Sequence, residues 1–273
     1  MAEAKVTFSF GKNWIDYLDT VSDSEVESAE KDIRQWLGSS YVSGKRVVDI
    51  GSGSGIHSLA FHRLGAQALH SFDYDEFSVR ATKTMWSKTK EPANWVVEQG
   101  SILDGDYIKS LGQFDIVYSW GVLHHTGSMW AAVTNAFSLV APGGRLWISL
   151  YKKGPRYESD LALKQKYNRA SELGKRLLEY RRIGKFMLAR ARHFQNPFAW
   201  NKKVSRGMNI YHDVIDWLGG LPYETATEDE VVTHARKYDF VLERIKAQNE
   251  GGCSVYVFSL PQRSSKDSTT FGN

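Results

Sequence analysis

The sequence predicts an α/β protein organised around a doubly wound, mostly parallel sheet, and three observations support this. The apolar run 47–50 precedes glycines at positions 51, 53 and 55, after which apolar residues recur at helical spacing, as expected of a strand, a turn and a helix. Further strand-like runs alternate with helical patterns up to residue 151. Two final strand-like runs, 240–247 and 254–260, flank a Gln-Asn-Glu-Gly-Gly loop and predict a terminal antiparallel hairpin.

The glycine turn indicates a nucleotide site. Glycine lets the backbone approach a ligand because it has no Cβ, and the N–H groups that begin the next helix face the same crevice. Dinucleotide-binding proteins place their third glycine where Ile56 stands here. This chain instead has G-x-G-x-G, with Asp49 two residues before the first glycine. The spacing therefore disfavours a nicotinamide-dependent dehydrogenase.

The segment Asp49–Gly55 resembles motif I of class I S-adenosylmethionine-dependent methyltransferases, which reads D/E-x-G-x-G-x-G. The resemblance implies a Rossmann-like, seven-stranded sheet with S-adenosyl-L-methionine in the crevice. The acid can approach the amino group of that ligand directly or through water. In this segment the implied cofactor contacts are Asp49, Gly51, Ser52 and Gly53.

The second strand, 68–73, ends in Asp73, twenty residues beyond Gly53. A carboxylate at this place can accept hydrogen bonds from both hydroxyls of an adenosine ribose. Tyr74 is a further cofactor contact. Together with Asp75 it opens the next helix, for which Asp75 is the more natural N-cap.

The third strand and its exit loop span 95–104. The resemblance implies that this loop passes the adenine, so Ser101 and Ile102 become cofactor contacts. The family often has an acid where Ser101 stands here. The adenine contact is therefore left to Ser101 and its backbone or to Asp104.

The run 114–126 contains the most specific match, because Val-Leu-His-His within it resembles motif IV of the same family. Its strand must end beside the glycine loop, where the strand order reverses. Ser119 and Trp120 are the cofactor contacts expected here. His124 follows beside the expected methyl position as a base or a substrate anchor, with a backbone-bonded turn histidine as the alternative. His125 is a candidate substrate contact.

A helix is predicted over about 129–140, followed by a Pro-Gly-Gly turn into a fifth strand. Tyr151 leaves that strand towards the same crevice and is a further candidate for catalysis.

Residues 1–45 form a predicted N-terminal cap. Its helix begins near Asp23, carries one apolar face and stops at Gly38. The stretch Phe10–Trp14 resembles a cap that covers the cofactor in related methyltransferases, with Trp14 in contact. A helix pair packed on the sheet edge is the alternative.

Residues 152–225 form an insertion after the fifth strand, and their apolar spacing predicts helices. The family places substrate lids here. His212 and Asp216 are four residues apart on a helix and could form an oriented catalytic base, or a purely structural pair. Arg206 could bind an anionic substrate group, and Tyr211 is a further substrate contact. The end of the insertion resembles a subset associated with surface-polysaccharide and other small-molecule modification.

The rest of the chain completes the domain plan. Residues 46–151 make the cofactor-binding core and 226–261 the end of the sheet, where Thr227 begins a capping box. The polar tail 262–273 is predicted to be disordered.

Composition narrows the setting and the partners. The single cysteine, Cys253, excludes an intramolecular disulfide and a cysteine-based metal site, and no acid–histidine cluster has metal-ligand spacing. No apolar run approaches a membrane span and the first residues lack signal-peptide character, so a cytoplasmic setting is the simplest interpretation. Residues 152–206 hold sixteen lysines and arginines against four acids, a net charge of +12 in a chain of net charge +4. This excess indicates contact with an anion such as a phosphate, an acidic sugar, a nucleic acid or a membrane surface, or else a solvated helix face.

The sequence thus favours methyl transfer from S-adenosylmethionine to an oxygen or nitrogen of a small-molecule or glycan acceptor, which the basic insertion suggests is anionic. RNA methylation through the basic insertion is the first alternative, although no RNA-binding module is recognisable. A non-catalytic binding protein is the second, and the unbroken glycine motif and Asp73 disfavour it. The oligomeric state does not follow from the sequence.

Overall fold

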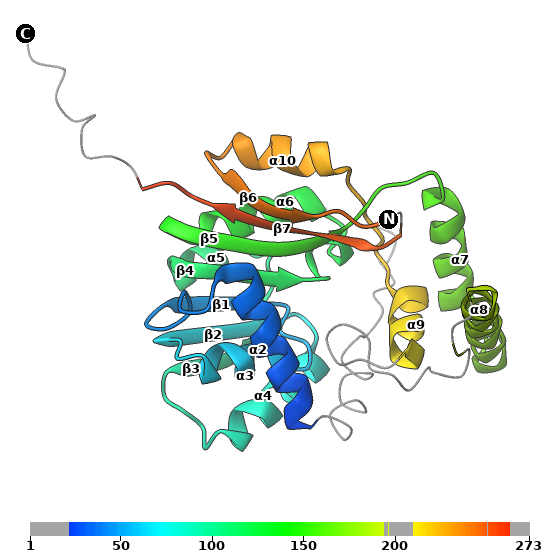
Figure 1. The fold of residues 1–273 in the computed structure, drawn as a ribbon, viewed down its shortest axis with the longest axis horizontal. Helices are drawn as coiled ribbons and strands as arrows, with labels where there is room; N and C mark the ends of the chain where they lie inside the picture. The colour runs from blue at the N-terminus through cyan, green and yellow to red at the C-terminus, as the bar shows by residue number, and fades with distance from the viewer. Residues whose placement is uncertain (1–21, 194–195, 197–209, 250, 263–273) are drawn as a thin grey trace, which may run out of the picture.

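The structure, a computed structural model, describes residues 22–193, 196, 210–249 and 251–262 (Figure 1). A seven-stranded sheet forms the centre of this part of the chain, in the order β3-β2-β1-β4-β5-β7-β6. β1 to β5 run parallel, and β7 is antiparallel to both β5 and β6. The Rossmann-like fold and the terminal hairpin are therefore confirmed. The strands are β1 (Arg46–Ile50), β2 (Ala68–Asp73), β3 (Trp95–Gln99), β4 (Phe114–Trp120), β5 (Val140–Tyr151), β6 (Val241–Lys246) and β7 (Cys253–Ser259).

The strand order reverses at β1, which lies between β2 and β4. Val47 pairs with Ile116 and Asp49 with Tyr118. Both strands are almost entirely buried, which explains why they are nearly continuous apolar runs rather than alternating ones. Their carboxyl ends open into one crevice, where doubly wound sheets bind ligands.

Helices cover both faces of the sheet (Figure 1). One set packs into the core that contains Val47 and Tyr118, and the other into the core that contains Val48 and Val117. Adjacent residues of a strand thus point into different cores. The first set is α2 (Asp23–Leu37), α3 (Ile56–Arg63) and α4 (Glu76–Lys88), and the second is α5 (Gly105–Leu111), α6 (Met129–Ser138) and α10 (Glu228–Arg236).

Several helix ends follow the signals in the sequence. Thr227 and Glu230 form the capping box that begins α10. Asp75 accepts a hydrogen bond from the Phe77 N–H at 2.9 Å and caps α4. Gly38, at a φ of +101°, ends α2.

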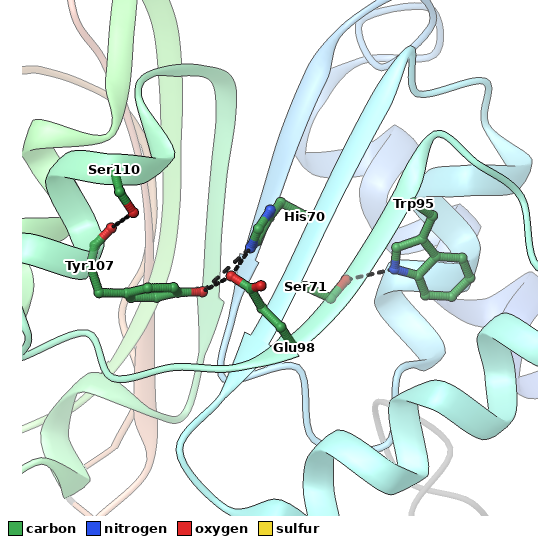
Figure 2. A network of polar contacts seen from close by, with 6 residues as sticks. All are labelled: His70, Ser71, Trp95, Glu98, Tyr107 and Ser110. Carbon is green, nitrogen blue, oxygen red and sulfur yellow. Dashed lines mark hydrogen bonds and ion pairs between the residues drawn. The ribbon is translucent and has the colours of Figure 1, made fainter.

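Helix α5 was not predicted. Asp104 caps it by accepting from the N–H groups of Asp106 and Tyr107, both at 3.1 Å. Figure 2 shows the Tyr107 side chain reaching Glu98 on β3 and His70 on β2. The Tyr107 hydroxyl donates to Glu98 Oε1 at 2.8 Å. Asp104 caps through Oδ1 and is not part of the lining of the cavity described below, so its contact with adenine stays a prediction.

The insertion contains three described helices, α7 (Tyr157–Arg169), α8 (Glu172–Arg192) and α9 (Ile210–Gly219). They share a small apolar cluster of Tyr167, Ile183, Val214 and Leu218. Figure 1 places these helices beside one end of the sheet, with α9 nearer the strands than α8. The insertion thus forms a helical unit next to the crevice.

Two kinds of feature are absent from the described residues, a membrane-spanning helix and a metal-binding group. No helix is long and apolar enough to cross a membrane, and no group of three or more histidine, cysteine, aspartate or glutamate residues could hold a metal ion.

Candidate active site

A cavity of about 940 Å³ lies at the carboxyl ends of β1, β2 and β4. One part is walled by the glycine turn and by the residues that follow β2 and β3. The other part is walled by the residues that follow β4 and β5, by α9 and by the start of β7. We call these parts the cofactor half and the acceptor half. The predicted residues that line the cavity are Asp49, Gly51, Ser52, Gly53, Asp73, Tyr74, Ser101, Ile102, Trp120, His124, His125, Tyr151 and Asp216.

Gly51 is a sterically tight point of the cofactor half. Its φ is +73°, which side chains rarely adopt, and a Cβ there would lie 2.4 Å from Val122 Cγ2. The N–H groups of Gly51 and Ser52 donate to the Phe72 carbonyl at 2.8 and 3.1 Å. These contacts bind the turn to β2, and the Ser52 hydroxyl lies 2.8 Å from that of Thr82.

Asp73 is fixed by two backbone hydrogen bonds. Its Oδ2 accepts from the Gly53 N–H at 3.0 Å and its Oδ1 from the Asp75 N–H at 2.9 Å. Each oxygen has two lone pairs, so each can accept one further bond. Two ribose hydroxyls would take those places. Burial raises the pKa of Asp73 to about 6, although the backbone hydrogen bonds that it accepts act to lower it.

Asp49 is a buried acid at the bottom of the cavity. The Ser58 hydroxyl donates to its Oδ2 at 2.5 Å, and Ser58 in turn contacts the hydroxyl of Ser71. Trp95 Nε1 completes this chain by donating to Ser71 Oγ at 2.9 Å (Figure 2). Burial raises the pKa of Asp49 to about 7, and the bond from Ser58 opposes that rise. A cationic group in the cavity would stabilise the carboxylate form.

The remaining cofactor-half residues lie at the adenine end and the rim. Ser101 Oγ accepts from the Leu103 N–H at 3.2 Å, which shapes the loop. Ile102 is buried and Tyr74 is exposed at the rim. The buried hydroxyl of Ser119 donates to the Ile50 carbonyl at 3.0 Å and the residue is not part of the cavity lining, so its contact with the cofactor stays a prediction.

His124, His125 and Tyr151 form a ring cluster in the acceptor half. The ring centroids of His124 lie 4.1 Å from Tyr151 and 4.5 Å from His125. His124 Nδ1 accepts from the Tyr151 N–H at 3.3 Å, so a neutral His124 carries its proton on Nε2. This tautomer makes Nε2 a hydrogen-bond donor and argues against His124 as the base.

His125 has the opposite tautomer. Its Nδ1 lies 2.7 Å from the Pro222 carbonyl, which can only accept, so the ring donates from Nδ1. Burial and the nearby ammonium of Lys164 lower the pKa of His125 to about 3, and the ring is therefore neutral at neutral pH. His125 offers a hydrogen-bond acceptor at Nε2 rather than a charge.

The acceptor half contains residues that the sequence did not single out. Trp217, Lys246, Gln248 and Cys253 line it beside Asp216. They come from α9, from the end of β6 and from β7, which are far from the recognised motifs in the sequence. Only the folded arrangement identifies them.

Lys164 lies fully buried beside the acceptor half. Its ammonium is a hydrogen-bond donor to the Trp217 carbonyl and lies 4.3 and 4.6 Å from the ring centroids of Trp217 and Tyr223. Burial, with the charge of Arg182, lowers its pKa to about 7. The contacts fix α9 against α7.

Besides Ser119, four predicted residues are not placed in the cavity. Trp14 and Arg206 lie outside the described residues, as does the side chain of His212, so the His212–Asp216 pair stays a prediction. The Tyr211 hydroxyl donates to Glu179 Oε2 on α8 at 3.3 Å and the residue is not part of the cavity lining, so its contact with the substrate stays a prediction.

Comparison with known proteins agrees with this geometry. A family model described as a methyltransferase domain matches residues 42–206, and the chain therefore belongs to that family. Its fold is shared by magnesium protoporphyrin IX methyltransferase from Synechocystis PCC 6803 with bound S-adenosylhomocysteine, at a TM-score of 0.52 and 14% identity over 86% of this chain and 82% of that one. An O-methyltransferase family protein from Burkholderia thailandensis has a TM-score of 0.55 and 14% identity, over 90% of this chain and 60% of that one.

Curated relatives match a shorter stretch. A ribosomal protein L11 methyltransferase from Macrococcus caseolyticus is 29% identical over 38% of this chain and 31% of its own length. A tRNA U34 carboxymethyltransferase from Idiomarina loihiensis is 30% identical over 38% of this chain and 32% of its own length. The chain thus spans about a third of the relatives it matches.

The chain thus carries the methyltransferase domain of this family, for which S-adenosyl-L-methionine is the cofactor expected from the sequence. The cofactor half fits this molecule. The glycine turn lines the cavity, Asp73 has one acceptor position left on each oxygen, and Asp49 is a buried acid suited to a cationic amino group.

Proposed function

We propose that the protein transfers a methyl group to an oxygen or nitrogen of a small-molecule or glycan acceptor that carries negative charge. The cavity supports this most directly, because it continues past the cofactor half into a second half formed by the insertion and the end of the sheet. Its total volume of about 940 Å³ is at the upper end for ligand pockets, so it has room for a cofactor and a small acceptor.

Methyl transfer from this cofactor does not require the protein to activate the methyl group. When bound, S-adenosylmethionine supplies an electrophilic methyl group on its sulfonium. The chain has to align the nucleophile, which can contribute ~7–11 kcal/mol in well-oriented systems, and to accept a proton if the nucleophile is a hydroxyl. The Asp216 carboxylate is a group in the acceptor half suited to accept that proton.

Negative charge on the acceptor is supported by the basic character of this region. Lys246 lines the acceptor half, and the insertion beside it carries a net charge of +12 over residues 152–206. Attraction of this kind should weaken as salt increases.

An RNA or protein acceptor is the alternative, favoured by the names of the two relatives above. Both similarities cover about a third of each relative, so they concern the shared domain more than the parts that select a substrate. The basic insertion would suit RNA as well as a small anion.

The test is to supply methyl-radiolabelled S-adenosylmethionine to the protein in a cell lysate and to fractionate the products. We expect label in small molecules or glycans that resist both ribonuclease and protease. Label released by ribonuclease would show that the acceptor is RNA, and label released by protease that it is a protein. The Asp216→Asn variant serves as the low-activity control.

A further inference from the structure

Helix α8 has two apolar faces, and the residues that the structure describes cover only one of them. The covered face carries Glu179 and Ile183 against α7 and α9. The other face exposes large apolar side chains to solvent, with exposed fractions of 80% for Leu173, 70% for Leu177, 62% for Tyr180 and 63% for Leu188. We call these four residues the α8 stripe.

The α8 stripe is continuous along the helix. Spacings of four, three and eight residues at 100° per residue place all four side chains within an arc of about 80°. Gly184 and Ala191 fall within the same arc, so no charge interrupts it. A helix face of this kind, pointing away from the core, has no role in folding the domain.

Basic residues flank the stripe on both sides. Arg176 lies along one edge, and Arg181, Lys185 and Arg192 lie along the other, all of them exposed. The acids of α8 do not balance them, because Glu179 is buried and Glu172 is paired with Lys175 at 2.9 Å at the start of the helix. An exposed apolar stripe between basic edges is the pattern of a helix that lies in a membrane interface.

We propose that α8 docks the protein on an anionic lipid bilayer, with the α8 stripe inserted among the acyl chains and its basic edges at the lipid headgroups. A second copy of the chain fits less well, since pairing two stripes would bring basic edges together. RNA would bind the basic edges through its phosphates, but it would make no favourable contact that requires three exposed leucines.

Docking through α8 would affect the acceptor half, because α8 packs against α9 and α9 lines that half of the cavity. The Arg182 guanidinium, on α8, lies 3.3 Å from the ring centroid of Trp217, which lines the cavity. Figure 1 places α8 on the far side of α9 from the sheet, at the outer edge of the molecule. A bilayer on α8 would therefore lie against the insertion and leave the cofactor half free.

Vesicle flotation with the full chain tests this without any methyl acceptor, so its result is independent of the proposed acceptor. We expect binding to vesicles of phosphatidylcholine with phosphatidylglycerol, at least about tenfold weaker binding to phosphatidylcholine alone, and loss of binding as salt rises. No binding to the anionic vesicles would overturn the proposal.

Matched variants separate the stripe from its edges. The pair Leu177→Gln and Leu188→Gln should weaken vesicle binding at least about tenfold, and the pair Arg181→Gln and Lys185→Gln should reduce binding and its salt dependence. The controls, Val241→Gln with Ile245→Gln and Lys83→Gln with Lys237→Gln, alter exposed residues of the same kinds elsewhere and should bind like the wild type.

Three outcomes would contradict the docking surface. Unchanged vesicle binding by the leucine variant would exclude insertion of the stripe. A wild-type dimer that the leucine variant dissociates, seen by light scattering with no vesicle binding, would assign the stripe to a second copy. Binding of single-stranded RNA that needs Arg181 and Lys185 but not the leucines, again with no vesicle binding, would assign the edges to RNA.

Discussion

Two separate constraints act at Gly51. One is its φ of +73°, which strains any residue with a side chain, and the other is the Val122 side chain, which would lie 2.4 Å from a Cβ. Gly44 has nearly the same φ, +74°, but nothing lies within 4 Å of the place its Cβ would take. The two glycines therefore form a matched pair in which only Gly51 has the steric constraint.

We expect Gly44→Ala to lower the free energy of unfolding by about 1 kcal/mol and Gly51→Ala by several kcal/mol. Denaturant titration of both variants measures the difference. Adding Val122→Ala to Gly51→Ala should recover part of it. Equal losses in the two single variants would mean that Val122 moves aside without penalty.

Asp73 should carry much of the cofactor affinity. Asp73→Ala removes the acceptor of both ribose hydroxyls, and we expect calorimetry to show S-adenosylhomocysteine binding weakened by about 1.5–3 kcal/mol. Asp106→Asn, an exposed acid on α5, is the control and should bind normally. The wild type should not bind NAD. Unchanged affinity in a folded Asp73→Ala variant would show that the ribose is held elsewhere.

Motif spacing in the sequence predicted the backbone of the cofactor half, but side-chain direction was harder to predict. Ser119 lies between Tyr118 and Trp120, which line the cavity, and successive side chains on a strand point to opposite faces. Tyr211 lies five residues before Asp216 on a helix, about 140° around the axis, and so faces α8. Motif spacing assigns a whole segment to the site, whereas the structure assigns single side chains to one face or the other.

At the level of elements, the helices with strong periodicity or caps were predicted and the short polar one was not. Helix α5 has seven residues and one fully buried side chain, Ile108, so it carries little apolar periodicity. Helix α8 presents the opposite difficulty. Both of its faces carry apolar residues, so the sequence pattern does not show which face is exposed. The position of α9 in the fold decides this.

Helix α9 supplies the acid of the acceptor half. We expect Asp216→Asn to lower kcat by about 10²–10⁴-fold if the acceptor is a hydroxyl, because the amide cannot take its proton. S-adenosylhomocysteine should bind with unchanged affinity, since Asp216 lies away from the cofactor half. Asp229→Asn, an exposed acid of α10, is the matched control. Loss of cofactor affinity in Asp216→Asn would show that Asp216 contacts the cofactor, which contradicts its assignment to the acceptor half.

At the level of the whole molecule, the strand order and the position of the crevice followed from the sequence, because four motif-bearing segments occur in the order of one known fold. The acceptor half did not, because β6, β7 and α9 meet there without a shared motif. Its residues are distant in sequence and of ordinary types. Tertiary packing alone brings them together.

Buried ionisable groups make the free energy of unfolding depend on pH, and Asp49 and His125 affect it in opposite directions. Asp49 has a folded-state pKa of about 7 against an ordinary value of 3.8, so the folded chain binds more protons over that range and Asp49 makes stability fall as pH rises. His125, whose pKa is lowered to about 3 from 6.5, acts in the opposite direction. The slope for the whole molecule is a sum, and a variant is needed to isolate one group.

Asp49→Asn isolates the acid, because the amide keeps an oxygen for the Ser58 hydroxyl and cannot ionise. Near pH 4 both proteins have a neutral group at this site and should be about equally stable. By pH 8 the variant should be more stable by roughly 4 kcal/mol, since only the wild type then buries a charge at this site.

Binding of S-adenosylhomocysteine should show the reverse pH dependence. Wild-type affinity should increase through pH 6–7 as Asp49 and Asp73 ionise, and the affinity of the variant should increase less. Denaturant titration and calorimetry over this pH range measure both. If the two stability curves stay parallel, Asp49 is not a buried charge, whereas divergence would show that the cofactor half keeps a destabilising carboxylate because its cationic ligand needs one.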